Sequence, residues 1–98
     1  MTRAEVLQAA QKIVCADREQ QYGSPEDNFA AIAQYWTYYT GLELTSLDVA
    51  NMMILLKLAR ESSGHHKDDN YIDIAGYAAC AAEIAEREQA READHDHN

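Results

Sequence analysis

The chain has 98 residues, a net charge of −9, and 8 Lys and Arg residues against 17 Asp and Glu. This length predicts a single domain with a limited core, which favours completion of the fold by homo-oligomerisation. The acidic balance argues against a protein that coats DNA or RNA, because phosphate neutralisation needs clustered Lys and Arg; a few local cations can still hold a small phosphorylated ligand.

Two helices are predicted in the first part of the chain. The first is expected over residues 2–21, where Thr2 and Glu5 have the spacing of a capping box. The second is expected to begin after Ser24, with proline at its first helical position, and to end at Gly41. Apolar residues recur at helical spacing through both segments.

A third helix is expected to begin at the cap Thr45 and to stop at Gly64. From Leu47 to Ala59 it is apolar nearly all round, which is typical of a central helix.

The fourth helix is expected to be capped by Asp68 or Asp69 and to run to about Ala90. The sequence therefore predicts an all-α fold, a compact four-helix arrangement with short connections and antiparallel neighbours. We expect residues 1–90 to form the single domain and residues 91–98 to form a flexible tail rich in acids and histidine.

The cysteine pattern and the length of the apolar runs predict the cellular compartment of the protein. Cys15 and Cys80 match no CxxC pattern, and both are expected to be buried free thiols. No apolar run is long enough to span a membrane, and the N-terminus has no apolar signal-peptide segment. We therefore expect a cytoplasmic protein that does not bind membranes.

Polar residues interrupt the third helix in two places. Asp48 and Asn51 are three residues apart and share a face, as do Lys57 and Arg60. The two basic residues suit a solvated helix end that favours the helix dipole, and they equally suit a phosphate grip. The second interpretation gains weight because Lys57 follows an apolar run where burial is expected.

Asp73 is the carboxylate of the fourth helix that capping does not explain. It lies inside the helix between two isoleucines, three residues after Asn70. A partly buried carboxylate needs a cation, a metal ion or hydrogen-bond donors, and Arg60, Lys57 or Mg²⁺ would each serve. His65 and His66, by contrast, are expected to be loop residues.

Aromatic and amide side chains elsewhere are candidate contacts for a base. Trp36 and Tyr77 carry rings that can stack on a nucleobase, although a tryptophan at this place is more often a core residue than a ligand platform. Asn28 and Asn70 carry amides that can read polar edges.

Several short strings together resemble a small family encoded by phages and prophages, which carries only a domain-of-unknown-function label. The likeness covers roughly residues 5 to 80 and names no activity. The strings are Asp17-Arg18, Tyr22-Gly23, Pro25-Glu26-Asp27-Asn28-Phe29, Trp36, Asp48-Val49-Ala50, Met53, Lys57-Leu58-Ala59-Arg60, Lys67-Asp68-Asp69-Asn70 and Asp73-Ile74-Ala75-Gly76-Tyr77-Ala78.

The chain is also distantly similar to the MazG-like all-α nucleotide pyrophosphohydrolases, which hold Mg²⁺ with carboxylates from two helices. That resemblance places Asp48-x-x-Asn51 at the first motif and Asn70-x-x-Asp73 at the second. Two of these four positions are amides, which are neutral and weaker ligands for a hard cation. Asp69 is the residue that could compensate.

Three functional hypotheses follow. The one we favour is binding of a nucleotide or nucleotide-derived ligand without turnover, as phage sponge proteins do against host defence signals, with Lys57 and Arg60 on the phosphates. The second is a Mg²⁺-dependent pyrophosphohydrolase with the metal on Asp48, Asp69 and Asp73. The third is a protein inhibitor of a host factor. No cofactor is certain, and Mg²⁺ is the one that the second hypothesis requires.

Overall fold

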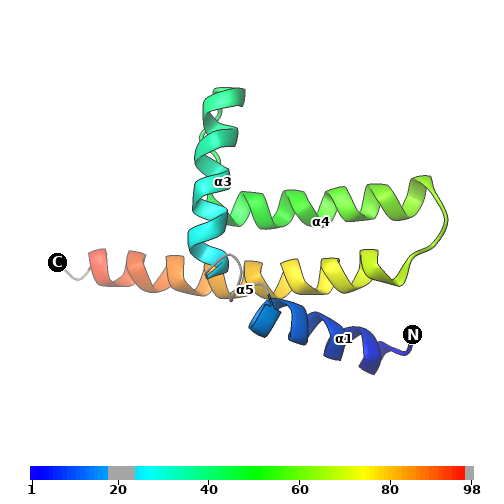
Figure 1. Ribbon diagram of the computed structural model, residues 1–98. Helices are drawn as coiled ribbons and strands as arrows, with labels where there is room; N and C mark the ends of the chain where they lie inside the picture. The colour runs from blue at the N-terminus through cyan, green and yellow to red at the C-terminus, as the bar shows by residue number, and fades with distance from the viewer. Residues whose placement is uncertain (18–23, 97–98) are drawn as a thin grey trace.

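The computed structural model describes residues 1–17 and 24–96, and within these ranges the chain is helical with no strand (Figure 1). The predicted all-α fold with four helices is confirmed. The elements are α1 (Arg3–Lys12), the short π-helix η1 (Ile13–Asp17), α3 (Pro25–Thr40), α4 (Ser46–Ser63) and α5 (Asp68–Asp96). The predicted end of the first helix, at residue 21, lies outside the described residues.

The predicted start signals of three helices are confirmed. Thr2 caps α1 and forms a capping box with Glu5, and Ser24 caps α3 through the backbone N–H of Asp27. Thr45 caps α4 in a second capping box. These side chains accept hydrogen bonds from N–H groups that have no partner within their helix.

Both glycines expected to end helices do so. Gly41 follows α3 with a φ of 75°, the left-handed conformation that glycine adopts without steric cost. Gly64 follows α4 in an extended conformation.

The ends of α5 differ from the prediction. Asp68 and Asp69 lie inside the first turn instead of at the cap, where they still favour the positive end of the helix dipole. The helix also continues to Asp96, beyond the expected end near Ala90, since Glu, Arg and Ala are all good helix formers in this segment.

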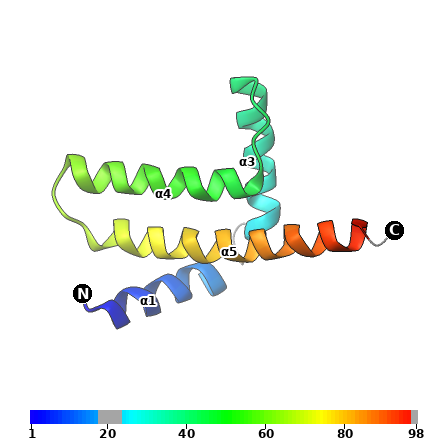
Figure 2. The same cartoon turned by 180° about the vertical axis from the view of Figure 1, so that it is seen from behind.

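The centre of the arrangement is α5, which packs against α1, η1, α3 and α4. Helices α4 and α5 run antiparallel side by side, α1 lies along the opposite side of α5, and α3 projects away from the pair (Figures 1 and 2). The prediction that the third helix is central is therefore wrong. Its apolar surface is wider than its two neighbours, α3 and α5, can cover: Val49 and Ala50 are buried, but Leu55 is 63% exposed.

The core forms where α3, α4 and α5 meet. Its buried members are Phe29, Ala33, Val49, Ala50, Cys80 and Ile84. The prediction for Cys80 is confirmed, but that for Cys15 is wrong, because Cys15 is exposed in η1. A π-helix closes i→i+5 hydrogen bonds, so the helical periodicity that predicted burial does not continue past Lys12.

The molecule is elongated. Its radius of gyration is 15.0 Å, whereas a compact chain of this length has about 13 Å. The difference arises because α3 and the C-terminal part of α5 extend beyond the other helices (Figure 2). Among the described residues, no helix combines the length and the apolar character needed to cross a membrane.

Candidate functional site

An ion pair joins the two antiparallel helices. The Nζ atom of Lys57 in α4 lies 2.9 Å from Oδ2 of Asp73 in α5, and the side chains are only 15% and 24% exposed. Of the partners considered for Asp73, the structure supplies Lys57. Each charge is largely removed from water, and each compensates the other.

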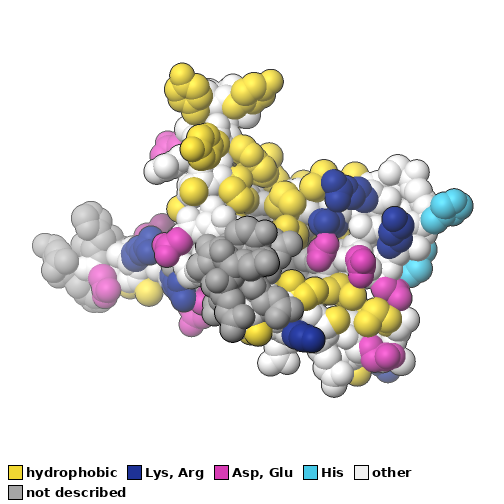
Figure 3. Space-filling view, in the orientation of Figure 1, with side chains coloured by type: hydrophobic (Ala, Val, Ile, Leu, Met, Phe, Trp, Pro, Cys, Tyr) yellow, Lys and Arg dark blue, Asp and Glu magenta, His cyan; other side chains and the backbone are white. Residues whose placement is uncertain are grey.

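Arg60 lies one turn beyond Lys57 and is exposed. Within residues 1–17 and 24–96 it makes no ion pair. Lys67, in the connection between α4 and α5, is a second exposed basic side chain at this end of the helix pair. Figure 3 shows Lys and Arg side chains gathered there beside acidic ones, over the ends of α4 and α5 that are remote from α3.

A second polar contact joins the same two helices through a residue that the sequence analysis did not single out. Nδ2 of the buried Asn70 donates to Oε1 of Glu61 at 3.0 Å, and the backbone N–H of Lys67 donates to the same oxygen at 3.1 Å. The signal that could have found Glu61 is its place in the last turn of α4, where the helix dipole disfavours an acid. An acid there needs donors, and the start of α5 provides them.

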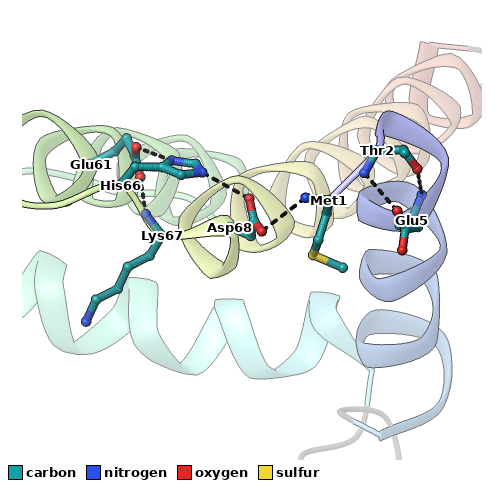
Figure 4. A network of polar contacts seen from close by, with 7 residues as sticks. All are labelled: Met1, Thr2, Glu5, Glu61, His66, Lys67 and Asp68. Atoms are coloured by element: carbon teal, nitrogen blue, oxygen red, sulfur yellow. Dashed lines mark hydrogen bonds and ion pairs between the residues drawn. The ribbon is translucent and has the colours of Figure 1, made fainter.

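The Glu61 carboxylate also belongs to a chain of charged groups that reaches the N-terminus (Figure 4). Nδ1 of His66 lies 2.6 Å from Oε2 of Glu61, and its Nε2 lies 3.0 Å from Oδ1 of Asp68. The α-amino group of Met1 donates to the other Asp68 oxygen at 3.3 Å. Residues from α4, α5 and the start of the chain therefore share one network.

The network shifts the affinities of its members for protons. The hydrogen bond from Asn70, together with those from Lys67 and His66, lowers the pKa of Glu61 to about 2. Glu61 and Asp68 raise the pKa of His66 because they accept hydrogen bonds from the charged ring. His66 and the N-terminus lower the pKa of Asp68.

The other candidate ligand residues lie in different surroundings. Tyr77 is half-buried one turn along α5 from Asp73, and its ring lies 6.0 Å from that of Phe29. Trp36 is partly buried and packs against the core where α3, α4 and α5 meet. The structure thus joins Lys57 and Asp73 and places Tyr77 one turn along α5 from Asp73, while Tyr77 and Trp36 both pack against the core.

Asn28 lies in the first turn of α3, where it is half-buried and its backbone N–H donates to the Ser24 carbonyl. Asn51 is exposed on α4. Neither has a side-chain hydrogen bond to another described residue.

The three carboxylates considered for a metal ion have separate environments. Oδ2 of Asp48 accepts the backbone N–H of Thr45 at 2.9 Å in the capping box of α4. Asp69 is exposed and Asp73 is paired with Lys57. Asp48 precedes Lys57 by nine residues, or about 13 Å along the helix. In the part of the chain that the structure describes, no group of three or more His, Cys, Asp and Glu side chains is placed to hold a metal ion.

Comparison with known proteins gives a family without an assigned activity. The model of the family described as "Domain of unknown function (DUF6378)" matches residues 5–85. The Gene 55 protein of Mycobacterium phage D29 is 42% identical over 82 residues, which are 83% of this chain and 54% of that protein. The Gene 55 protein of Mycobacterium phage L5 is 45% identical over 74 residues, 74% of this chain and 47% of that protein. The chain therefore spans about half the length of these curated relatives, and no solved structure matches it.

Proposed function

This chain belongs to the DUF6378 family, which has members in phages, and from the geometry of its α4–α5 pair we propose that it binds a nucleotide or nucleotide-derived phosphorylated ligand without cleaving it. The binding region in this proposal is the end of the helix pair around Lys57 and Arg60. The phage relatives motivate a further part of the proposal, that the ligand is a host signalling nucleotide and that its capture counters host defence.

The observation that carries the proposal is the exposed guanidinium of Arg60 beside the Lys57–Asp73 pair. The chain has only 8 basic residues and a net charge of −9, yet three of the basic residues, Lys57, Arg60 and Lys67, lie at one end of the α4–α5 pair. A guanidinium with free donors can bind a phosphate through two parallel hydrogen bonds. The ammonium group of Lys57 would provide a second contact one turn away.

Asp73 has a defined part in this proposal. Its carboxylate forms an ion pair with the ammonium group of Lys57. An incoming phosphate would therefore compete with Asp73 for that ammonium group. Such competition weakens the binding of simple anions and favours ligands that add other contacts. Tyr77 is the aromatic residue that we assign to the base, because it lies one turn from Asp73 on the same helix.

The buried amide of Asn70 has a different role from a direct ligand contact. It is only 8% exposed and donates to Glu61, which joins the ends of α4 and α5. We assign it to positioning of the basic side chains around the α4–α5 turn.

Binding without turnover is favoured because two carboxylates that a Mg²⁺-dependent hydrolase would use have other partners. Asp48 closes the capping box with Thr45, and Asp73 pairs with Lys57. A hard divalent cation would have to displace both interactions to use them.

Isothermal titration with nucleoside mono-, di- and triphosphates and cyclic mono- and dinucleotides, with and without Mg²⁺, tests the proposal. We expect micromolar or tighter binding of at least one ligand and its recovery unchanged after incubation. Folded protein that binds none of them rejects the proposal. Release of pyrophosphate from a nucleoside triphosphate in Mg²⁺ supports the hydrolase alternative instead.

Two substitutions locate the binding region. Arg60→Gln is expected to weaken binding about tenfold or more, because it removes a charge-assisted contact. The control is Arg3→Gln, which changes the net charge equally at an exposed position on α1. Asp73→Asn is expected to tighten binding because it frees Lys57, whereas weaker binding would show that Asp73 itself contacts the ligand.

A further inference from the structure

A continuous set of exposed apolar side chains covers the C-terminal half of α3, the segment after it, and the side of α4 that faces away from α5. Figure 3 shows hydrophobic side chains over the projecting part of α3 and along the adjoining part of α4. We call this surface the α3–α4 face. Its members, with their exposed fractions, are Tyr35 (77%), Tyr38 (93%), Tyr39 (91%), Leu42 (65%), Met52 (41%), Leu55 (63%) and Leu56 (41%).

The spacing of these residues shows that each helix presents one stripe. Tyr35, Tyr38 and Tyr39 occupy positions i, i+3 and i+4 of α3, and Met52, Leu55 and Leu56 repeat that spacing on α4. Such a stripe is the pattern that a helix shows toward a packing partner. The opposite side of α4 already has its partner, since Val49, Ala50 and Lys57 face the core or α5.

The area of the face is that of a stable protein interface. At about 200 Å² for each aromatic side chain, the three tyrosines alone expose about 500 Å². A standard dimer buries about 800 Å² per partner, and the four aliphatic members extend the tyrosine surface toward that value. A single exposed leucine needs no explanation, but a contiguous patch of this size indicates an interaction site.

The charge distribution argues for a second copy of the chain as the partner. Residues 28–42 and 49–56 contain no Asp, Glu, Lys or Arg, although charged residues make up 26% of the chain. Two copies that each carry a net charge of −9 repel one another. An interface on the uncharged α3–α4 face brings no acidic side chain of these two segments against another.

The shape of the molecule also suits reciprocal packing. Helix α3 projects beyond α4 in both views (Figures 1 and 2). Tyr38 also lines an open hollow of about 410 Å³, whose other lining residues are uncharged members of α3, of the segment between α3 and α4, and of the start of α4, including Ala33, Thr37 and Leu44. The same surface therefore carries exposed rings and an uncharged hollow next to them, which suits the self-complementary contact of a two-fold interface.

We propose that the α3–α4 face is the interface of a homodimer in which α3 of each copy packs against α4 of the other about a two-fold axis. This arrangement covers the stripe on α4, which is exposed among the described residues of a single chain. It leaves the Lys57–Asp73 pair, which faces α5, outside the interface.

Sedimentation equilibrium of the full chain over 1–200 µM tests the proposal. We expect a mass of twice the 11.0 kDa chain at the higher concentrations. Tyr38→Glu and Leu55→Glu are each expected to reduce the mass to that of a monomer, because each buries a charge in the interface. Both side chains are exposed in the single chain, so far-UV circular dichroism should show unchanged helix content.

The matched control is Leu7→Glu on α1. Leu7 is 62% exposed, nearly the same as Leu55 at 63%, but it lies outside the α3–α4 face. This variant should remain dimeric. A wild-type chain that is monomeric at 200 µM overturns the proposal and leaves the face to a different protein. Dissociation by Leu7→Glu with no effect of Tyr38→Glu overturns it as well, because the dimer then forms through α1.

Discussion

Oε1 of Glu61 lies 3.0 Å from Nδ2 of the buried Asn70, so one hydrogen bond fixes the last turn of α4 to the first turn of α5. The same oxygen accepts the backbone N–H of Lys67 between the two helices. Two hydrogen bonds to Glu61 therefore hold α4 and α5 together at the turn, in addition to the apolar contacts between the helices. The basic side chains proposed to bind a ligand, Lys57 and Arg60, precede Glu61 on α4.

Loss of the Asn70 amide should destabilise the fold. Asn70→Ala removes a hydrogen bond to a carboxylate at a position that is 8% exposed, and we expect the free energy of unfolding to fall by about 1–3 kcal/mol. Urea denaturation followed by circular dichroism measures the change. Asn51→Ala is the control, because Asn51 is exposed on α4 and its loss should change stability by no more than about 0.5 kcal/mol. Equal effects of the two substitutions would contradict the role given to Asn70.

His66 should make stability depend on pH above its ordinary pKa of 6.5. Its pKa is raised above the ordinary 6.5 in the folded chain by hydrogen bonds to Glu61 and Asp68. Its contribution is therefore fully present below pH 6.5 and is lost as the pH rises through the folded pKa. In denaturation midpoints measured from pH 5 to 9, this contribution should appear as a fall above pH 6.5, which His66→Gln should flatten.

The matched control for this prediction is His65→Gln. His65 is exposed and makes no hydrogen bond with the residues that the structure describes. Its replacement should leave the pH profile unchanged. A profile that His66→Gln does not alter would rule out the network as its cause.

Glu61 should contribute to the fall in the free energy of unfolding at acid pH. Its pKa is lowered from 4.5 to about 2 in the folded chain, so its contribution is complete above pH 4.5 and is lost as the pH falls toward 2. Glu61→Gln should therefore reduce the change in stability between pH 5 and 2. Glu83→Gln is the control: Glu83 is also acidic, but its side chain is 61% exposed and pairs with Arg87 four residues on along the same helix. The Glu83→Gln variant should lose stability at acid pH to the same extent as the wild type.

The sequence predicted the helices well because their end signals are local. Thr2, Ser24 and Thr45 cap their helices through contacts within three residues, and Gly41 ends α3 by its own backbone conformation. Such features need no knowledge of the rest of the fold. The extent of α5 was underestimated because its last turns carry many charges, which were interpreted as a tail although their helix propensity is high.

The candidate site was predictable only in part, because its contacts join residues distant in the sequence. The need of Asp73 for a partner followed from its apolar neighbours, but the choice of Lys57 over Arg60 depends on how α4 and α5 align. Glu61 was missed because its donors, Lys67 and Asn70, come together only when the turn closes. The central place of α5 was missed for a related reason: apolar periodicity shows that a helix has a packing surface but does not show which element covers it.

The close approach of α5 to η1 gives the last prediction. A Cβ atom built on Gly76 would lie 2.8 Å from Cγ2 of Val14, a distance that real Cβ contacts essentially never show. Gly76→Ala should therefore force the two elements apart and cost about 1–3 kcal/mol in packing, offset by about 1 kcal/mol from the better helix propensity of alanine. We expect a net loss of stability in urea denaturation.

The double variant Val14→Ala, Gly76→Ala should lose less stability than the sum of the losses in the two single variants, because removal of the valine methyl groups makes room for the new Cβ. Gly64→Ala is the control, since a Cβ there meets only the Arg60 carbonyl oxygen at 3.7 Å, an ordinary contact. An additive double variant would show that Gly76 and Val14 are not in contact.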